Sequence, residues 1–285
     1  MNNMPTELFW NSHEIGQIEG FWYFVAAMDG TAAFRSGFEP RNDDILLTSF
    51  TKTGTTWLKA VCYNILDKEV GEDLLAEKNP HEVVPTLGNT FLKDQIQRIY
   101  LPEAVRESGC KFVYVARNPK DTVVSMWHFY NKLFTRGGSE SFPLERAVES
   151  FCSGAVPFGP FYEHVVGYWE ESRRRPEEVL FLKYEDLCRE PKEQVRKLAS
   201  FMGKAGGDDD EVVVEKVLWR SSLGRLKELE VNKNGVLELV RVPNAHFFRK
   251  GTVGDWKNYL TPRMAERIDQ LTQFKLQGTG LSLDD

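Results

Sequence analysis

Short apolar runs alternate along the chain with segments in which apolar residues recur at helical spacing. The run DILLTSF (44–50) precedes a polar loop, TKTGTT, and a stretch in which Trp57, Val61 and Ile65 share one helical face. This pattern predicts a strand, a loop and a helix, in that order. The apolar face of the helix is expected to pack against the sheet to which the strand belongs.

The same order of elements recurs twice further along the chain. KFVYVAR (111–117) precedes a helical stretch that begins with Asn118, a favourable N-cap, and Pro119, which suits the first helical position. VLFLKYEDL (179–187) precedes another helical stretch, which Gly203 is expected to end. Repeated units of this kind predict an α/β fold with a central, mainly parallel sheet flanked by helices. Ligands of such folds bind at the carboxyl ends of the strands.

Composition narrows the class of protein further. With 285 residues, of which 41% are apolar, the chain suits a single domain over residues 1–285. Its net charge of −6 leaves no broad basic surface for nucleic acid or an anionic membrane. The start of the chain lacks the pattern of a signal peptide, and no apolar run reaches the ~18 residues of a membrane span. We therefore expect a cytoplasmic protein whose anion sites are local.

The cysteines are scattered and form no CxxC pair, so we expect reduced thiols and neither a disulfide framework nor a metal site. They are Cys62, Cys110, Cys152 and Cys188.

The loop TKTGTTW (51–57) combines a lysine, a glycine and threonine hydroxyls at the start of a predicted helix. Backbone N–H groups, the helix dipole and a cation would converge there on an anion. Lys52 precedes Gly54, so the GxxxxGK[ST] order of a Walker A loop is absent. This order argues against an ordinary ATPase or a P-loop nucleotide kinase.

Two other segments place cations beside predicted turns. Arg117 ends the second predicted strand, and Ser125 lies eight residues later, about two helical turns on. In FFRKGTVGDWKNYLTP, Arg249 and Lys250 adjoin glycines, which permit a close approach of the backbone to a phosphate. Either pair alone would be an ordinary surface feature. Whether the pair indicates a phosphate-binding site therefore depends on the motif that surrounds it.

Taken in order, these motifs resemble those of plant-type soluble (cytosolic) sulfotransferases. TKTGTTWLKA is similar to the 5'-phosphosulfate loop of that family, with Thr51 in place of the usual proline. VARNPKDTVVSMW and FFRKG are similar to its 3'-phosphate elements, and NPHEVVPTL and LEVNKNG point to its plant branch. The resemblance covers residues 40–262 and implies a P-loop-like sulfotransferase fold. It also implies transfer of a sulfuryl group from 3'-phosphoadenosine 5'-phosphosulfate (PAPS) to a hydroxyl of a small organic acceptor, with no metal.

The same resemblance implies a role for individual residues. Lys52 and the adjoining backbone would hold the 5'-phosphosulfate, with Lys52 also stabilising the leaving group, and Trp57 would stack on adenine. Tyr184 would contact the purine, and Ser221 or Ser222 would meet the nucleotide where Leu223 replaces the family's aromatic residue. The complete expected nucleotide-binding set is Lys52, Thr53, Gly54, Thr55, Thr56, Trp57, Arg117, Ser125, Tyr184, Ser222, Phe247, Arg249, Lys250 and Gly251.

One part of the family pattern is absent. The family's general base is a histidine in a Thr-His-x-Pro segment, but here FLKDQIQRIYLPEAV (91–105) joins the flanks of that segment directly. No histidine lies between His81, in the NPHEVVP turn, and His128, in the second predicted helix. Because a positioned base contributes about 10²- to 10⁴-fold to the rate, we expect impaired turnover. Removal of His81 is expected to change nothing. The alternative is a relative that binds PAPS or its product without efficient turnover.

Two properties stay open at the level of sequence. The acceptor is not identified by the aromatic stretch EGFWYF (19–24), so flavonoids, steroids, hydroxyjasmonates and glucosinolate precursors all remain candidates. KNYLTPRMAE resembles the family's dimerisation motif, but Pro262 replaces the usual valine, so a homodimer is neither required nor excluded.

Overall fold

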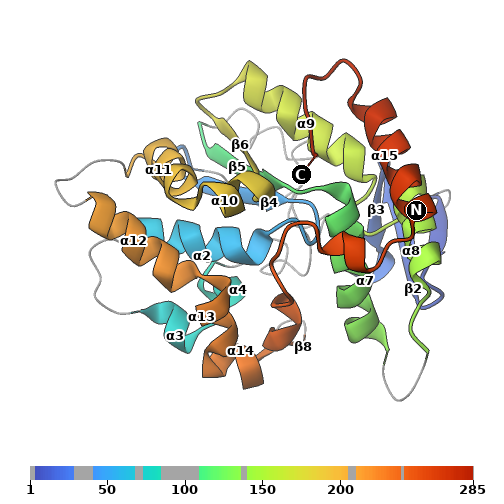
Figure 1. Ribbon diagram of the computed structural model, residues 1–285, viewed down its shortest axis with the longest axis horizontal. Helices are drawn as coiled ribbons and strands as arrows, with labels where there is room; N and C mark the ends of the chain where they lie inside the picture. Colours follow the sequence, from blue (N-terminus) through green and yellow to red (C-terminus); the bar gives the residue numbers. More distant parts are fainter. Residues whose placement is uncertain are drawn as a thin grey trace.

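The computed structural model describes residues 4–28, 41–67, 73–84, 109–135, 140–204, 210–238 and 241–284. A parallel three-stranded sheet with the strand order β4-β5-β6 lies at its centre (Figure 1). Its strands are β4 (Ile45–Ser49), β5 (Lys111–Ala116) and β6 (Val179–Lys183). All three are strands that the apolar runs predict, which confirms the expected α/β fold with a parallel sheet flanked by helices.

The other elements, in chain order, are β1 (Thr6–Phe9), β2 (His13–Ile18), β3 (Phe21–Phe24), η1 (Val25–Ala27), α2 (Thr55–Leu66), α3 (Leu74–Glu77), α4 (Pro80–Val83), α7 (Pro119–Phe134), α8 (Leu144–Ser153), α9 (Phe161–Arg174), α10 (Tyr184–Arg189), α11 (Pro191–Phe201), α12 (Asp210–Ser221), α13 (Leu223–Glu228), α14 (Glu230–Asn234), β7 (Val236–Leu237), β8 (Val242–Pro243), η3 (Asn244–Phe247), η4 (Asp255–Asn258) and α15 (Pro262–Leu276).

Alternate residues of β5 enter two different cores, as the two-residue period of a strand requires. Phe112 and Tyr114 pack in a core that includes residues of α7, α8, α9 and α15. Val113 and Val115 pack in a core that includes residues of α2, α11 and α12. Figure 1 shows α9 and α15 above the sheet and α2 and α12 below it. The sheet is therefore covered on both faces, and its carboxyl edge is the place left for a ligand.

The three central strands end level with one another. In the parallel registers, Ser49 of β4 lies opposite Val115 of β5, and Ala116 of β5 lies opposite Lys183 of β6. The loops that follow β4, β5 and β6 therefore begin along one edge of the sheet. These loops, with the starts of the helices that follow them, carry eight of the residues expected to bind the nucleotide: Lys52 to Trp57, Arg117 and Tyr184.

Two helix boundaries agree with the local signals in the sequence. The side chain of Asn118 accepts a hydrogen bond of 2.9 Å from the backbone N–H of Lys120, and Pro119 is the first residue of α7. Helix α11 ends at Phe201, and Gly203 beyond it adopts a left-handed φ of 70°. Both predictions of helix boundaries are confirmed.

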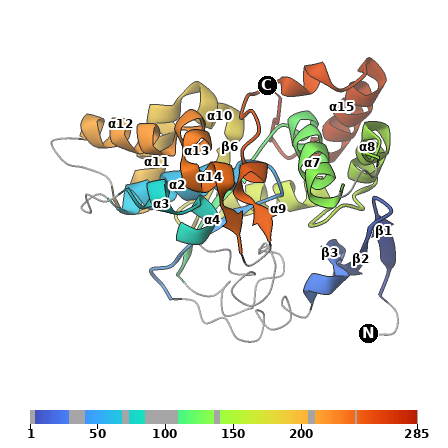
Figure 2. The same ribbon diagram turned by 90° about the horizontal axis from the view of Figure 1, so that it is seen from below.

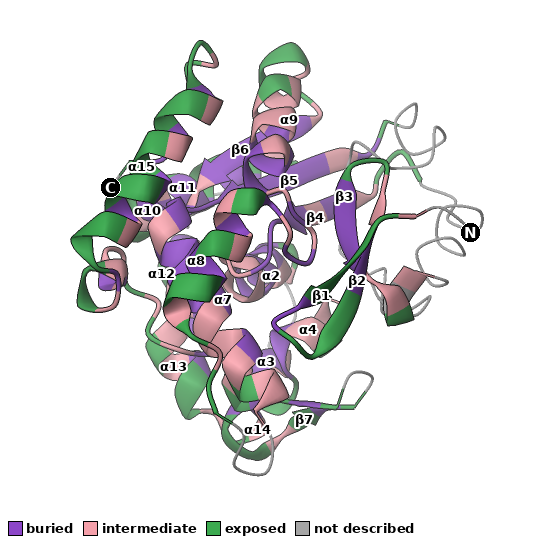
Figure 3. Ribbon diagram, turned by 90° about the vertical axis from the view of Figure 1, so that its right-hand side faces the viewer, coloured by how far each residue is buried: buried purple, intermediate pink, exposed green. Residues whose placement is uncertain are grey.

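A second sheet, which the sequence pattern does not predict, forms from β1, β2 and β3. It is antiparallel, with the order β1-β2-β3, and lies far from α11 and α12 (Figure 2). Figure 3 shows that β3 is buried, whereas much of β1 and β2 is exposed. Phe9 and Trp10 join this sheet to the main core by packing edge to face on Tyr130 of α7, with ring centroids 5.1 and 5.6 Å apart.

The four cysteines are free thiols, and Cys62 and Cys110 are buried. Across the described part of the chain, no helix combines the length and the apolar character needed to cross a membrane. Residues 85–108, with the segment in which the sequence lacks a histidine, lie outside the described residues, as do residues 205–209.

Candidate functional site

The loop after β4 is a tight turn built around two unusual backbone conformations. Lys52 has a left-handed φ of 69°, and Gly54 has a φ of 122°. A Cβ atom at Gly54 would lie only 2.9 Å from the ring of Tyr184, so both conformation and space require glycine here. The hydroxyl of Thr53 donates to the carbonyl oxygen of Phe50 at 2.7 Å. Thr53 therefore stabilises the turn itself.

Helix α2 begins directly after this turn with its first N–H groups free of a side-chain cap, because its N-cap is Gly54. No acidic residue lies in its first turn. The hydroxyl of Thr55 contacts that of Ser49 at 2.5 Å, and the hydroxyl of Thr56 contacts Nε2 of His81 at 2.9 Å. The open N-terminus and the helix dipole suit an anion such as a phosphosulfate group.

Lys52 extends from this turn toward α7. Its Nζ lies 4.3 Å from the centroid of the Phe129 ring. Burial, together with the smaller effect of the positive charges of Arg117, Arg249 and Lys132, lowers the pKa of Lys52 to about 7. The cations expected at the 5' and 3' ends of the nucleotide therefore lie within electrostatic reach of one another, and a bound anion would relieve their mutual repulsion.

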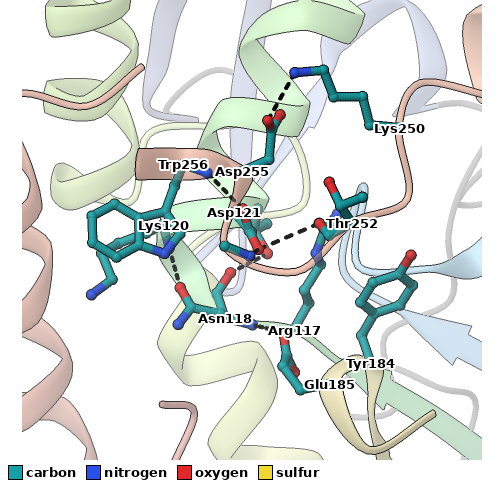
Figure 4. Close-up of polar contacts among 12 residues, drawn as sticks. Arg117, Asn118, Lys120, Asp121, Tyr184, Glu185, Lys250, Thr252, Asp255 and Trp256 are labelled. Atoms are coloured by element: carbon teal, nitrogen blue, oxygen red, sulfur yellow. Dashed lines mark hydrogen bonds and ion pairs between the residues drawn. The ribbon is translucent and has the colours of Figure 1, made fainter. Parts of the chain in front are cut away.

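Arg117 follows β5 and is almost fully buried, with 4% of its surface exposed. Its Nη2 donates to the carbonyl oxygen of Thr252 at 2.9 Å and lies 3.6 Å from Oδ2 of Asp121 (Figure 4). Its guanidinium carbon lies 4.5 Å from the centroid of the Tyr184 ring. The buried Nε of Arg117 has no hydrogen-bond partner among the described residues. One donor of this guanidinium group is therefore available to a ligand.

Sequence reasoning missed Asp121. This residue holds against α7 the loop that follows η3 and contains the Arg-Lys-Gly motif, which we call the C-terminal loop. Its fully buried carboxylate accepts hydrogen bonds from the backbone N–H groups of Gly254 at 2.7 Å and Trp256 at 3.0 Å. The acid in the first turn of α7 is visible in the sequence, but its partners lie 133 and 135 residues away. This docking brings the Arg-Lys-Gly loop beside Arg117.

Asp255 pairs with both cations of that loop. Its carboxylate contacts the guanidinium group of Arg249 and accepts from Nζ of Lys250 at 2.9 Å. Burial alone would raise the pKa of Asp255, but hydrogen bonds from Lys250 and Arg249 outweigh it and hold the pKa well below the usual value. The buried Nε of Arg249, like that of Arg117, has no partner among the described residues.

Tyr184, the first residue after β6, contacts the Lys52 turn and helix α2, the guanidinium group of Arg117 and the Arg-Lys-Gly loop. Its hydroxyl donates to the carbonyl oxygen of Gly251 at 2.7 Å, and its ring meets that of Trp57 edge to face, with centroids 6.0 Å apart. Burial raises its pKa, so it remains a neutral phenol. Tyr184 thus fixes the relative positions of the turn at Gly54, the guanidinium group of Arg117 and the loop at Gly251.

The remaining expected residues occupy different surroundings. Ser125 is buried on α7, one turn after Asp121. The hydroxyl of Ser222 caps α13, whereas that of Ser221 accepts from Asn64 of α2 at 3.0 Å inside the protein. Ser222 is therefore the less constrained of the two alternatives. The ring of Phe247 lies 4.4 Å from that of His81.

The histidines are divided between the site and the rest of the molecule. His164 is buried against the Tyr114 hydroxyl at 2.8 Å, and His13 stacks on Phe134 at 4.0 Å. Burial and the smaller effect of the Arg249 charge are the two largest causes that lower the pKa of His128 to about 4. Burial lowers the pKa of His81 and of His246; the charges of Lys59 and then Lys52 add to this at His81, and those of Lys132 and then Lys52 add to it at His246. The structure therefore brings His81 and His246 near the Lys52 turn.

Comparison with known proteins gives consistent results. Residues 42–280 match the family described as "Sulfotransferase domain". Cytosolic sulfotransferase 6 of Arabidopsis thaliana is 37% identical over an alignment of 306 positions, which covers 99% of this chain and 93% of that protein. The crystal structure of a putative steroid sulphotransferase of Arabidopsis thaliana has a TM-score of 0.77 and 30% identity, over 99% of this chain and 93% of that one. Mouse sulfotransferase SULT7A1, solved in complex with PAP, has a TM-score of 0.70 and 26% identity, over 93% and 94% of the two chains.

Proposed function

Because the chain belongs to the sulfotransferase family, we propose that it binds PAPS and transfers the sulfuryl group to a hydroxyl of a small organic acceptor in the cytoplasm. The observation that carries this proposal is the convergence of Lys52, Arg117 and Arg249 at the carboxyl edge of the sheet. Burial is the main cause of the lowered pKa of Lys52, and the charges of Arg117 and Arg249 add to it, as expected where a ligand with several negative charges binds.

The polar groups of the site fit the two ends of such a nucleotide. Buried N–H donors normally have partners, yet Nε of Arg117 and Nε of Arg249 have none among the described residues. A 3'-phosphate would satisfy both. At the other end, the open N-terminus of α2 would receive the 5'-phosphosulfate. Trp57 and Tyr184, whose rings meet edge to face, would hold the adenine.

The chemistry required of the protein is charge stabilisation and alignment. The acceptor oxygen attacks sulfur, the bond between sulfur and the bridging phosphate oxygen breaks, and the acceptor loses its proton. Negative charge develops on the bridging oxygen, where the ammonium group of Lys52 would stabilise it. Since an anion beside Lys52 favours its charged form, bound PAPS would raise the depressed pKa of this lysine.

We also propose that turnover is impaired, because the sequence has no histidine between His81 and His128. The alignment with Arabidopsis cytosolic sulfotransferase 6 has 306 positions, more than the 285 residues of this chain, so part of that relative has no counterpart here. The competing function is nucleotide binding without efficient turnover. An assay of acceptors with labelled PAPS, beside nucleotide-binding calorimetry, distinguishes the two.

The binding half of the proposal is tested directly by calorimetry on the purified chain. We expect tighter binding of 3'-phosphoadenosine 5'-phosphate (PAP) than of ATP or 5'-AMP, because separate cations meet its two phosphates. Equal affinity for 5'-AMP and PAP would rule out the proposed 3'-phosphate site.

A further inference from the structure

Two polar residues of α2 face a histidine of α4 directly behind the Lys52 turn. Thr56 and Lys59 are three residues apart, and so lie on the same side of the helix. Nε2 of His81 lies 2.9 Å from the Thr56 hydroxyl, and Nδ1 of His81 lies 3.2 Å from Nζ of Lys59. Both ring nitrogens of His81 are therefore engaged, one of them by a residue of the expected 5'-phosphosulfate loop.

The His81 ring is held in place by its surroundings. The side chain of Asn79 caps α4 by accepting from the backbone N–H of His81 at 2.9 Å, and Glu82 completes a capping box. On the other side, the ring of Phe247 lies 4.4 Å away at an angle of 36°. A ring fixed in this way can impose one orientation on the groups that it contacts.

The contacts of the ring determine where its proton resides. Burial lowers the pKa of Lys59 to about 7. Below that pH Lys59 is an ammonium group with only hydrogen-bond donors, so Nδ1 of His81 must accept from it. In the neutral imidazole the hydrogen then lies on Nε2 and is donated to the oxygen of Thr56. Burial, with the nearby charges of Lys59 and Lys52, lowers the pKa of His81 well below its usual value and keeps the ring neutral.

We propose that His81 is a positioning residue, which accepts from Lys59, donates to the oxygen of Thr56, and so leaves the hydroxyl hydrogen of Thr56 to bind the 5' group of the nucleotide. Thr56 is in the first turn of α2, where an anion would also meet the helix N–H groups. This role rests on the proposed function. It does not make His81 the general base, since neither ring nitrogen is left to accept a proton. It does replace the expectation that removing His81 changes nothing.

The test compares His81→Ala, His81→Gln and His81→Asn by calorimetry with PAP and with adenosine 3'-monophosphate. The amide nitrogen of glutamine can reach the place of Nε2, whereas asparagine reaches only the place of Nδ1. We expect His81→Ala and His81→Asn to weaken PAP binding about two- to tenfold, and His81→Gln to restore most of it. Binding of adenosine 3'-monophosphate, which lacks a 5' group, should be unchanged in all three.

A double-mutant cycle with Thr56→Val separates this role from general support of the fold. If His81 acts through Thr56, His81→Ala in the Thr56→Val background should cost no further PAP affinity. Fully additive losses, or equal losses for PAP and adenosine 3'-monophosphate, would overturn the role of His81 while leaving the proposed function intact. A wild-type protein that binds PAP no better than adenosine 3'-monophosphate would instead overturn the 5' site itself, and the role of His81 with it.

Discussion

Asn79 and Asn232 lie 153 residues apart in the sequence, yet the side-chain amide of Asn79 donates to that of Asn232 at 2.8 Å. Both residues are buried, and Asn232 also donates to the carbonyl oxygen of Leu226 at 2.8 Å. The bond joins NPHEVVPTL to LEVNKNG, the two segments that in the sequence point to the plant branch. It ties α4, which carries His81, to α14.

Asn79→Ala should destabilise the protein by about 1 to 3 kcal/mol, because it removes the cap of α4 and leaves the buried oxygen of Asn232 without its donor. The measurement is urea unfolding followed by fluorescence. The matched control is Asn234→Ala, because Asn234 lies on α14 with Asn232 but is exposed. It should change stability by less than about 0.5 kcal/mol. Equal effects of the two substitutions would show that the Asn79 bond contributes nothing specific.

Arg117→Ala should weaken PAP binding by about one to two decades, since it removes a charge-assisted contact worth roughly 1.5 to 3 kcal/mol. Arg117→Lys should restore little, because an ammonium group cannot contact Thr252, Asp121 and the Tyr184 ring as the planar guanidinium does. Calorimetry with PAP provides the measurement. Lys183→Ala, beside Tyr184, is the control and should bind PAP as the wild type does.

Arg249→Ala should reduce the preference for PAP over 5'-AMP more than Lys250→Ala does. The side chain of Arg249 is 15% exposed and has an unpartnered Nε, whereas that of Lys250 is 49% exposed and more screened by solvent. Both variants should show the loss in calorimetry while keeping the wild-type circular dichroism spectrum. Unchanged preference in both folded variants would mean that the C-terminal loop does not bind the 3'-phosphate.

The sequence predicts those features that depend on neighbouring residues. The strand before Lys52, the cap at Asn118 and the end of α11 near Gly203 all follow from period and local conformation, and all are found. The antiparallel sheet was missed because Phe21, Trp22 and Tyr23 are consecutive aromatic residues, which hide the two-residue period of β3.

Contacts between segments that are far apart in the sequence cannot be predicted from the sequence alone. Nothing near Asp121 indicates that its carboxylate binds backbone N–H groups of Gly254 and Trp256, and nothing near His81 indicates Thr56 and Lys59 as partners. Such pairs exist only once the elements have packed. The roles assigned to the nucleotide-binding residues themselves stay predictions, for which the structure supplies the spatial arrangement.

Asp255→Asn should destabilise the protein at neutral pH and have a smaller effect in acid. The folded-state pKa of Asp255 is depressed, so its ion pairs stabilise the fold above the unfolded value of about 3.8 and lose that contribution as the pH falls through the folded value. Melting temperatures of wild type and variant, compared at pH 7 and at several values below 4, provide the measurement. A difference that stays constant or grows toward acid would contradict the assigned pairs with Arg249 and Lys250.

The last prediction separates binding from turnover. Lys52, Arg117 and Arg249 lie on elements outside the segment that lacks the family's histidine, so PAP affinity should match that of an intact relative. Sulfation of any natural acceptor should nevertheless be at least about two decades slower, since no positioned base removes the acceptor proton.

Inserting a relative's Thr-His-x-Pro segment between Ile96 and Leu101 should raise the rate without changing PAP affinity. The same insert with its histidine replaced by alanine is the control and should not raise it. A rate in the unaltered chain equal to that of an intact relative would show that another group already serves as the base.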